Sequence, residues 1–282
     1  MERKPFDPAG KHAVITGAGS GIGLALARAL TDLGGAVLMA DVNEDAASAE
    51  AEKIRAAGGR AIGMGCDVTD REQIEALAER AWAEFGSVEL VANNAGITVP
   101  RRKVIKSAEE DARRVMEVNY FGVWFGTAVF GQRFVEQGTP AHILNTSSEN
   151  GLGAPVKGIG LYTASKHAVL GMSDVLRQEL PDHVGVSVLC PGAVATGMTS
   201  LPRKGDELEF GMAPEQIAAI AIQGMREGHF IIPTHPPMRE FVDERYEATA
   251  AAFESLSPRF EGDERLDTRH IIEVMTERMR EG

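Results

Sequence analysis

The chain has 282 residues, which is enough for one α/β domain with a full hydrophobic core. Its net charge of −12 argues against nucleic-acid binding and against attachment to a membrane surface, since both favour a basic face. No stretch approaches the ~18 consecutive apolar residues of a membrane span, and residues 1–10 lack the apolar core of a signal peptide.

The cysteines, Cys66 and Cys190, each end an apolar strand pattern. We interpret them as small buried hydrophobic residues and not as a disulfide or a metal pair. Free thiols of this kind are typical of a reducing compartment, so we expect a cytoplasmic protein.

Strand and helix patterns alternate along most of the chain, which is typical of a parallel sheet covered on both faces. The expected strands are residues 13–16, 37–40, 60–66, 88–92, 141–146, 184–189 and 230–232. The expected helices are residues 24–33, 44–57, 71–85, 107–137 and 161–180, with a further helix starting at 213–215. A capping box over residues 69–72 is expected to open the third helix.

The fold class that follows is α/β, with a doubly wound parallel sheet of the Rossmann type in a single domain over residues 1–233. Residues 234–282 contain two amphipathic helix patterns, 238–256 and 267–279, and form a helical C-terminal extension in this prediction. His235, between the two regions, has no metal-ligand spacing around it and is predicted to be structural.

A glycine-rich turn joins the first expected strand to the first expected helix. Gly17, Gly21 and Gly23 lie where backbone amides at a helix N-terminus can approach a pyrophosphate. A glycine-rich loop alone is often only a tight turn. Asp41 ends the second expected strand, where a carboxylate can bind both ribose hydroxyls of an adenosine, although it can also simply cap the next turn.

Tyr162 and Lys166 lie one turn apart if residues 161–180 are helical. A fixed cation beside a phenol lowers its pKa, and a tyrosine of this kind can act as a general acid or base. By itself the pair more often marks a solvated helix face. Asn119 lies within the expected helix 107–137, and because Asn is a poor residue inside a helix it suggests a local distortion that holds a water.

The motifs, taken in order, resemble the short-chain dehydrogenase/reductase family in its common soluble, NAD-dependent form. They are Thr16-Gly17-x-x-x-Gly21-Ile22-Gly23, Asn93-Asn94-Ala95-Gly96, Ser148, Tyr162-x-x-x-Lys166 and Pro191-Gly192. The resemblance covers about residues 10–233 and leaves the last fifty or so residues outside the shared pattern.

The resemblance implies a set of site residues. The catalytic residues would be Asn119, Ser148, Tyr162 and Lys166, with Ser147 as a structural neighbour of Ser148. The residues that contact NAD would be Gly17, Ser20, Gly21, Ile22, Gly23, Asp41, Asp67, Val68, Asn94, Ala95, Gly96, Tyr162, Lys166, Pro191, Gly192, Val194 and Thr196. No metal is implied. Val42 and Ser20 carry no charge where an enzyme that uses NADP would supply Arg or Lys, so we expect a preference for NAD.

The implied function is hydride transfer between NAD(H) and a small-molecule secondary alcohol or ketone, hydrophobic or aromatic in kind. The alternatives are an NAD-binding redox-sensing regulator without turnover, and a reductase of C=N or C=C bonds on the same scaffold. The expected pocket wall is mostly apolar, with a mobile lid over residues 197–212. Glu149 and Asn150 would form a polar wall either near the substrate or at the surface. The expected wall residues are Ile97, Val99, Leu152, Val156, Met198 and Leu201.

We expect no nucleic-acid or membrane partner, and a homodimer or homotetramer. The reason for the oligomer is that several apolar residues of the expected helix 107–137 leave more surface than one sheet face should cover. These residues are Val115, Val118, Val123, Phe125, Val129 and Phe130.

Overall fold

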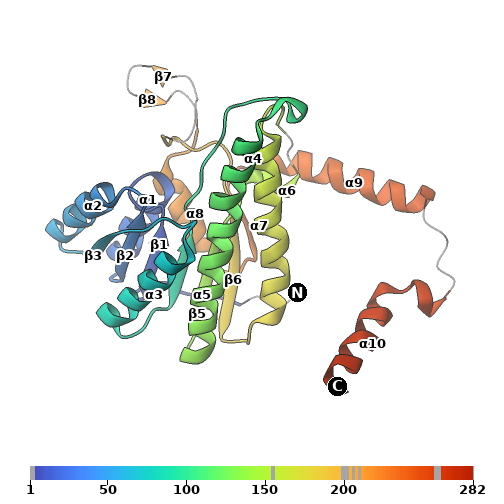
Figure 1. Cartoon of the computed structure of the whole chain (residues 1–282), viewed down its shortest axis with the longest axis horizontal. Coiled ribbons are helices and arrows are strands. Elements are labelled where there is room, and N and C mark those ends of the chain that lie inside the picture. The colour runs from blue at the N-terminus through green and yellow to red at the C-terminus, as the bar shows by residue number, and fades with distance from the viewer. Residues whose placement is uncertain are drawn as a thin grey trace. The chain divides into compact units, whose positions relative to one another are not determined.

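The computed structural model describes residues 4–153, 156–197, 203–204, 207–208, 211–256 and 262–281. The chain divides into two compact units, Met1–Arg239 and Glu240–Gly282. The first unit holds the central sheet and its covering helices (Figure 1). Residues 234–239 therefore belong with the sheet.

A seven-stranded sheet, parallel at every pairing, forms the centre of the first unit. Its order is β3-β2-β1-β4-β5-β6-β9, and the strand order reverses between β1 and β4. This topology confirms the predicted doubly wound sheet, and it places a crevice where the carboxyl ends of β1 and β4 diverge. The strands are β1 (His12–Thr16), β2 (Ala36–Asp41), β3 (Arg60–Gly65), β4 (Leu90–Asn93), β5 (Ala141–Thr146), β6 (Val184–Cys190) and β9 (Ile231–Pro233).

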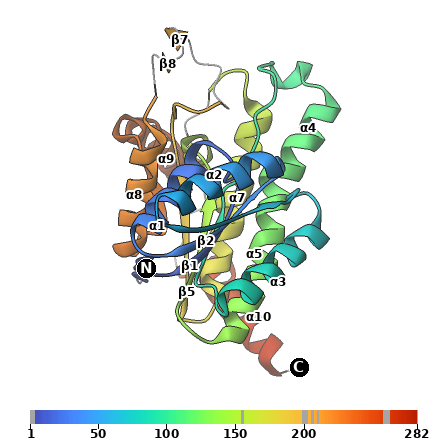
Figure 2. The same ribbon diagram turned by 90° about the vertical axis from the view of Figure 1, so that its left-hand side faces the viewer.

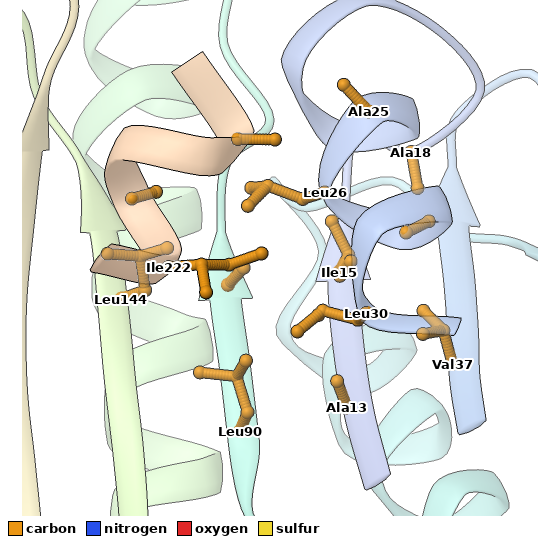
Figure 3. Packing of buried hydrophobic residues seen from close by; sticks show 14 of the residues in the cluster. Ala13, Ile15, Ala18, Ala25, Leu26, Leu30, Val37, Leu90, Leu144 and Ile222 are labelled. Atoms are coloured by element: carbon orange, nitrogen blue, oxygen red, sulfur yellow. The ribbon is translucent and has the colours of Figure 1, made fainter. Parts of the chain in front are cut away.

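Helices cover both faces of this sheet (Figure 2). One face is covered by α1 (Gly21–Asp32), α2 (Glu44–Ala56) and α8 (Pro214–Arg226), whose apolar residues join one core cluster. In that cluster Leu26 and Leu30 of α1 and Ile222 of α8 meet Ile15 of β1 and Leu144 of β5 (Figure 3). The other face is covered by α3 (Arg71–Phe85), α5 (Gly122–Gln137) and α7 (Gly160–Glu179), around a second cluster. The strands are buried on both faces because they are nearly continuous apolar runs.

The predicted helix over residues 107–137 is interrupted in the structure. α4 (Glu109–Met116) is followed by a π-helical turn, η2 (Glu117–Phe121), and then by α5. The local distortion expected from Asn119 is present, since this residue lies inside η2. π-helical turns inserted in α-helices occur frequently at functional sites.

The capping box predicted over residues 69–72 is wrong. Asp70, not Thr69, is the N-cap of α3, and its carboxylate accepts from the backbone N–H of Glu72 at 3.0 Å. The Thr69 hydroxyl instead donates to Asp67 at 2.8 Å. An aspartate is as good an N-cap as a threonine, so two adjacent candidates left the helix start ambiguous.

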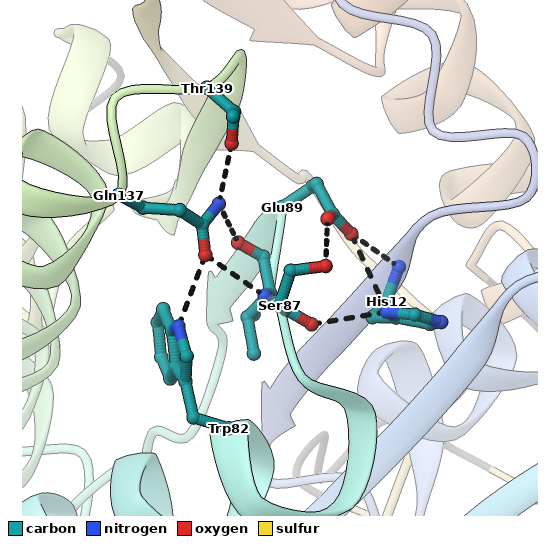
Figure 4. A network of polar contacts seen from close by, with 7 residues as sticks. His12, Trp82, Ser87, Glu89, Gln137 and Thr139 are labelled. Carbon is teal, nitrogen blue, oxygen red and sulfur yellow. Dashed lines mark hydrogen bonds and ion pairs between the residues drawn. The ribbon is translucent and has the colours of Figure 1, made fainter.

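The amino-terminal edge of the sheet carries a closed network of polar groups (Figure 4). The Gln137 side chain, at the end of α5, accepts from Trp82 Nε1 at 3.1 Å and donates to the Val88 carbonyl at 3.0 Å. Glu89 accepts from the backbone N–H of His12 at 2.9 Å and from the Ser87 hydroxyl at 2.6 Å. These bonds tie the residues before β4 to α3 and α5, and they tie the start of β1 to the residues before β4.

Most of the apolar residues expected to form an oligomer surface do not reach the surface. Val115, Val123, Val129 and Phe130 are buried within the single chain and so leave no surface to a partner. The apolar side chains exposed on α5 and α7 are others, including Trp124 and Val175, which are 40% and 53% exposed.

Several elements lie outside the predicted pattern. They are η1 (Val104–Lys106), the one-turn helix α6 (Glu149–Leu152), the strand pair β7 (Arg203–Lys204) and β8 (Glu207–Leu208), and η3 (Pro236–Met238). Most of the predicted lid, including Met198 and Leu201, lies outside the described residues.

The second unit is formed by α9 (Arg239–Leu256, whose first residue belongs to the first unit), η4 (Glu264–Leu266) and α10 (Thr268–Glu281). Large apolar side chains of both helices are exposed, among them Phe241, Phe253 and Ile272. Within the described parts of the chain, no helix combines the length and the apolar character that crossing a membrane requires.

Candidate active site

The glycine-rich turn after β1 is shaped by close backbone contacts. Gly17 and Gly21 have φ angles of +65° and +54°, which residues with a side chain rarely adopt. A Cβ on Gly17 would lie 2.8 Å from the Cα of Ala95, and a Cβ on Gly23 would lie 2.2 Å from the Gly17 carbonyl oxygen. Glycine is therefore required for α1 and the segment after β4 to approach the turn, and the N-terminus of α1 stays open to an anion.

Asn94 fastens the segment after β4 to the end of β1. Its side-chain amide donates to the Thr16 carbonyl at 3.0 Å, and the Thr16 hydroxyl accepts from the backbone N–H groups of Asn94 and Ala95 at 3.0 and 3.1 Å. These bonds hold the strand ends together at the point where the sheet order reverses.

Asp41 ends β2 beside the glycine-rich turn. Its carboxylate accepts from the backbone N–H of Gly19 at 2.9 Å and from that of Asn43 at 2.9 Å. The residue therefore does cap the turn that follows, and it also braces the glycine-rich turn. Each carboxylate oxygen has further acceptor capacity, so a ribose hydroxyl can still bind.

Asp67 and Val68 follow β3 on the same side of the sheet. The Asp67 carboxylate accepts from the backbone N–H of Thr69 at 2.9 Å. Val68 packs against Gly122, where a Cβ would come within 2.7 Å of the valine side chain. The start of α5 thus lies against the loop that forms one wall of the site.

A cavity of about 680 Å³ lies along the carboxyl ends of these strands. Every residue predicted to contact the cofactor lines it except Gly23, which packs behind the turn. The open helix N-terminus, the close backbone approach and the carboxylate at Asp41 together fit a nicotinamide dinucleotide. Of the lining residues, Asp41 ends β2 and Asp67 follows β3. Tyr162 and Lys166 lie on α7, and Gly192 follows β6.

Sequence reasoning missed some lining residues of this cavity. They include Cys66, Thr146, Arg114, Glu117 and Val118. The last three come from α4 and η2, and their register depends on the π-helical turn, which a helical pattern in the sequence does not fix. Among the predicted wall residues Ile97 lines the cavity, whereas Val156 is exposed.

The two candidate serines have different partners. The side chain of Ser148 is hydrogen-bonded to Tyr162, and it donates to the Pro191 carbonyl at 3.2 Å. The Ser147 hydroxyl donates to the Lys166 carbonyl at 2.7 Å, which ties β5 to the backbone of α7. The structure thus brings Ser148, and not Ser147, to the Tyr162 side chain.

The pKa of Tyr162 is raised above its ordinary value, mainly because burial disfavours the phenolate, while the hydrogen bond with Ser148 acts in the opposite direction. The expected lowering by Lys166 is therefore wrong for the chain alone. The physical reason is position: Lys166 Nζ lies 5.7 Å from the centroid of the Tyr162 ring and donates to the Thr146 carbonyl at 2.9 Å. Burial also lowers the pKa of Lys166 to about 8.

Asn119 is fully buried in η2, next to these groups. Its amide exchanges two hydrogen bonds with Ile97, accepting from the backbone N–H at 2.8 Å and donating to the carbonyl at 3.0 Å. It also donates to the Ser165 hydroxyl at 3.1 Å. The π-helical turn thus aims Asn119 across to α7, beside Lys166. The water that it was predicted to hold stays a prediction.

The cysteines are buried free thiols, as predicted from the sequence. Burial raises the pKa of both Cys66 and Cys190 to about 12, so neither is a thiolate at neutral pH. Among the residues that the structure describes, no group of three or more His, Cys, Asp or Glu side chains could hold a metal ion.

Known proteins resemble this chain in sequence and in fold. Residues 11–206 match the family model for short chain dehydrogenases. The chain is 37% identical over 229 residues to 1-deoxy-11-beta-hydroxypentalenate dehydrogenase of Streptomyces exfoliatus, covering 79% of this chain and 82% of that one. It is 32% identical over 220 residues to 3beta-hydroxysteroid dehydrogenase 2 of Eggerthella lenta, covering 78% and 84%.

Among solved structures, a short-chain dehydrogenase/reductase from Burkholderia phymatum in complex with NAD superposes with a TM-score of 0.81. It is 34% identical, and the match covers 90% of this chain and 99% of that one. Family model, relatives and fold agree with the geometry of the cavity, and the chain belongs to the short-chain dehydrogenase/reductase family of oxidoreductases, which bind a nicotinamide cofactor.

Proposed function

We propose that this protein is an NAD-dependent dehydrogenase that interconverts a secondary alcohol and a ketone. The observation that carries the proposal is that Tyr162, which is hydrogen-bonded to Ser148, lines the same cavity as the buried Lys166 and the glycine-rich turn. This arrangement supports a proton-transfer group and a cofactor site within one cavity.

In this proposal Tyr162 carries the substrate proton, taking it from the hydroxyl during oxidation and returning it during reduction. Ser148 hydrogen-bonds the same substrate oxygen and stabilises the charge that develops on it. Lys166 binds the nicotinamide ribose, and Asn119 holds a water that links Lys166 to solvent. The residues that line the cavity would hold NAD, and the bound cofactor would supply the acceptor for the hydride of the carbinol carbon. The raised pKa of Tyr162 favours its protonated form, which suits it as a proton donor.

The preference for NAD over NADP rests on Asp41. A 2′-phosphate would place a dianion beside its carboxylate, and like charges at that distance are strongly unfavourable. Val42, which is 77% exposed, and Ser20 offer no compensating charge. The similar Burkholderia phymatum protein was solved with NAD, which supports the same assignment.

For the substrate we propose a hydrophobic or aromatic secondary alcohol. The two relatives are named for a hydroxypentalenate and a hydroxysteroid, and Ile97 supplies an apolar wall to the cavity. A panel of cyclic, aromatic and aliphatic alcohols, assayed by NADH formation at 340 nm, tests both proposals. NADH formation with hydrophobic alcohols is the expected result.

The alternatives make different predictions in the same assay. A redox-sensing regulator would bind NADH without turning over any alcohol or ketone. A reductase of C=N or C=C bonds would oxidise NADH with imines or enones and leave saturated ketones unchanged. Turnover of alcohols by the Tyr162→Phe variant at the wild-type rate would contradict the alcohol dehydrogenase assignment, whichever alcohol is used.

We also propose a homodimer or homotetramer. Exposed apolar side chains on neighbouring helices, such as Trp124 on α5 and Val175 on α7, support it. Light scattering on the full chain at micromolar concentration gives the test, and a mass of 30 kDa, that of one chain, would count against an oligomer.

A further inference from the structure

His235 lies just after β9, on the opposite side of the Pro191–Ala193 turn from the catalytic serine. Its ring Nδ1 lies 3.1 Å from the backbone nitrogen of Gly192 and 2.7 Å from the Thr234 hydroxyl. Its Nε2 lies 3.0 Å from the Ala193 carbonyl oxygen. Both ring nitrogens therefore engage the turn that follows β6.

These contacts select one form of the imidazole. The Ala193 carbonyl can only accept, so Nε2 carries the proton and donates. The Gly192 N–H can only donate, so Nδ1 is the acceptor. A ring with its proton at Nε2 therefore satisfies both contacts, and the Gly192 N–H has a second acceptor in the Thr234 hydroxyl at 3.3 Å.

The same turn is held from the other side by the catalytic segment. The Pro191 carbonyl accepts from the backbone N–H of Glu149 at 3.0 Å and from the Ser148 hydroxyl at 3.2 Å. Consecutive residues of the turn thus bond in opposite directions, to Ser148 and Glu149 on one side and to His235 on the other.

Gly192 lets these groups approach so closely. A Cβ on Gly192 would lie 2.3 Å from Glu149 Oε2 and 2.6 Å from the His235 ring. Glu149 Oε2 is buried without a hydrogen-bond partner, so the carboxylate and the imidazole pack against the same glycine. No side chain other than hydrogen fits between them without a shift.

We propose that His235 is a positioning residue that holds the Pro191–Ala193 turn in place for the nicotinamide half of the cofactor. The inference rests on the proposed function, under which the nicotinamide lies at the Tyr162 end of the cavity, where Pro191 and Gly192 are lining residues. The adenosine half lies at Asp41, on strands that His235 does not touch. His235 thus acts on one half of the cofactor.

The test compares two ligands that differ only in that half. Isothermal titration of the full chain with NADH and with ADP-ribose, which lacks the nicotinamide, is carried out on the wild type and on His235→Leu. We expect His235→Leu to weaken NADH binding about tenfold or more, as for the loss of hydrogen bonds that order the turn. ADP-ribose binding should change less than about twofold, which is within the effect of a distant substitution.

Conservative variants keep the test decisive if His235→Leu fails to fold. His235→Gln can place an amide N–H near the position of Nε2, and His235→Asn can place a carbonyl oxygen near that of Nδ1. Each should restore part of the NADH affinity. His229→Leu is the matched control, since His229 lies in the same unit, bonds Glu227 at the surface and should leave both affinities unchanged.

Unchanged NADH affinity in all three His235 variants would overturn the assignment. Equal weakening of NADH and ADP-ribose would also overturn it, because the residue would then support the whole cavity. Wild-type protein that binds ADP-ribose but not NADH would remove the basis for this role while leaving a nucleotide site. Wild-type protein that binds neither would overturn the proposed function itself.

Discussion

The two edges of the central sheet differ in how fully their polar side chains are hydrogen-bonded. At the amino edge Gln137, Glu89 and His12 form a closed set of hydrogen bonds with Trp82, Ser87 and the backbone (Figure 4). At the carboxyl edge and just after it, buried side-chain atoms lack a partner. In the described part of the chain these are Asn93 Oδ1, Thr146 Oγ1, Glu149 Oε2, Asn150 Oδ1 and, beside Tyr162, Thr163 Oγ1.

An unpaired buried polar atom costs about 1–3 kcal/mol, so natural chains keep few of them outside functional sites. His142 Nδ1, near the start of β5, is the exception at the amino edge among the described residues. This difference indicates that the polar groups of the amino edge mainly stabilise the fold. The unpaired groups of the carboxyl edge cost stability and are available to hydrogen-bond ligands. Substitutions at the two edges should separate activity from stability.

The largest effect is expected from Tyr162→Phe, which removes only the phenol oxygen. Alcohol oxidation should fall by about 10³-fold or more, since proton transfer by a positioned side chain contributes about 10²–10⁴. NADH affinity, measured by titration, should stay within about twofold. In the wild type the oxidation rate should rise with pH through the alkaline range, because burial raises the pKa of Tyr162 and the phenolate is the base. Activity within a few-fold of wild type would exclude the assigned role.

The neighbouring serines give the next contrast. Ser148→Ala should reduce kcat by about 10²–10³, as for a lost donor to a developing oxyanion. Ser147→Ala should reduce kcat far less and instead lower the free energy of unfolding by about 1 kcal/mol, because its hydroxyl ties β5 to α7. Steady-state kinetics and urea unfolding of both variants decide the matter. The reverse pattern would assign catalysis to Ser147.

Cofactor choice is the third expectation. The wild type should prefer NAD over NADP by at least about a hundredfold in kcat/KM, which corresponds to about 2.7 kcal/mol. Asp41→Ala combined with Val42→Arg should shift the preference toward NADP. Asp41→Asn is the control for the bond to Gly19: it keeps an acceptor and removes the charge, so it should reduce discrimination without abolishing NAD use. Equal kcat/KM values in the wild type would show that Asp41 does not read the ribose.

The sequence predicted the sheet, because buried parallel strands are continuous apolar runs and glycines at a strand-to-helix turn have few other uses. Asn119 signalled the helix distortion because Asn is costly inside a helix. The sign of the Tyr162 pKa shift was wrong because burial, which a sequence does not display, outweighs a lysine held over the ring. His235 was interpreted only as structural, since its bonds to the turn after β6 depend on where β9 ends.

At the amino edge the effect should fall on stability. Gln137→Met keeps the length of the side chain but leaves Trp82 Nε1 and the Val88 carbonyl without partners. We expect a loss of about 2 kcal/mol in the free energy of unfolding, with kcat/KM unchanged within about twofold. Gln132→Met is the matched control on the exposed face of α5, where the change should stay within about 0.5 kcal/mol. A loss of activity without a loss of stability would contradict the comparison.

The smallest effect has the opposite sign and comes from Lys166→Met. Burial lowers the Lys166 pKa from 10.5 to about 8, so near neutral pH the charged lysine destabilises the fold, on the order of 3 kcal/mol at 1.36 kcal/mol per pKa unit. Removing it also strands the Thr146 carbonyl, which costs about 1–3 kcal/mol. The expected net gain is about 1 kcal/mol in the free energy of unfolding, together with loss of turnover.

The pH dependence isolates this lysine. Between about pH 8 and 10.5 the unfolded chain keeps the Lys166 proton while the folded chain has released it. Because the unfolded state then binds more protons, this group makes wild-type stability rise with pH across that window. In Lys166→Met that rise should be absent, so the two urea-derived stability curves should cross within the window, and the wild type should be more stable by about 2 kcal/mol near pH 10.5, which is the cost of the stranded Thr146 carbonyl. Lys166→Arg, which stays charged throughout, is the control. Parallel curves would show that the burial of Lys166 does not lower the free energy of unfolding, and that the carboxyl edge loses no stability at this residue.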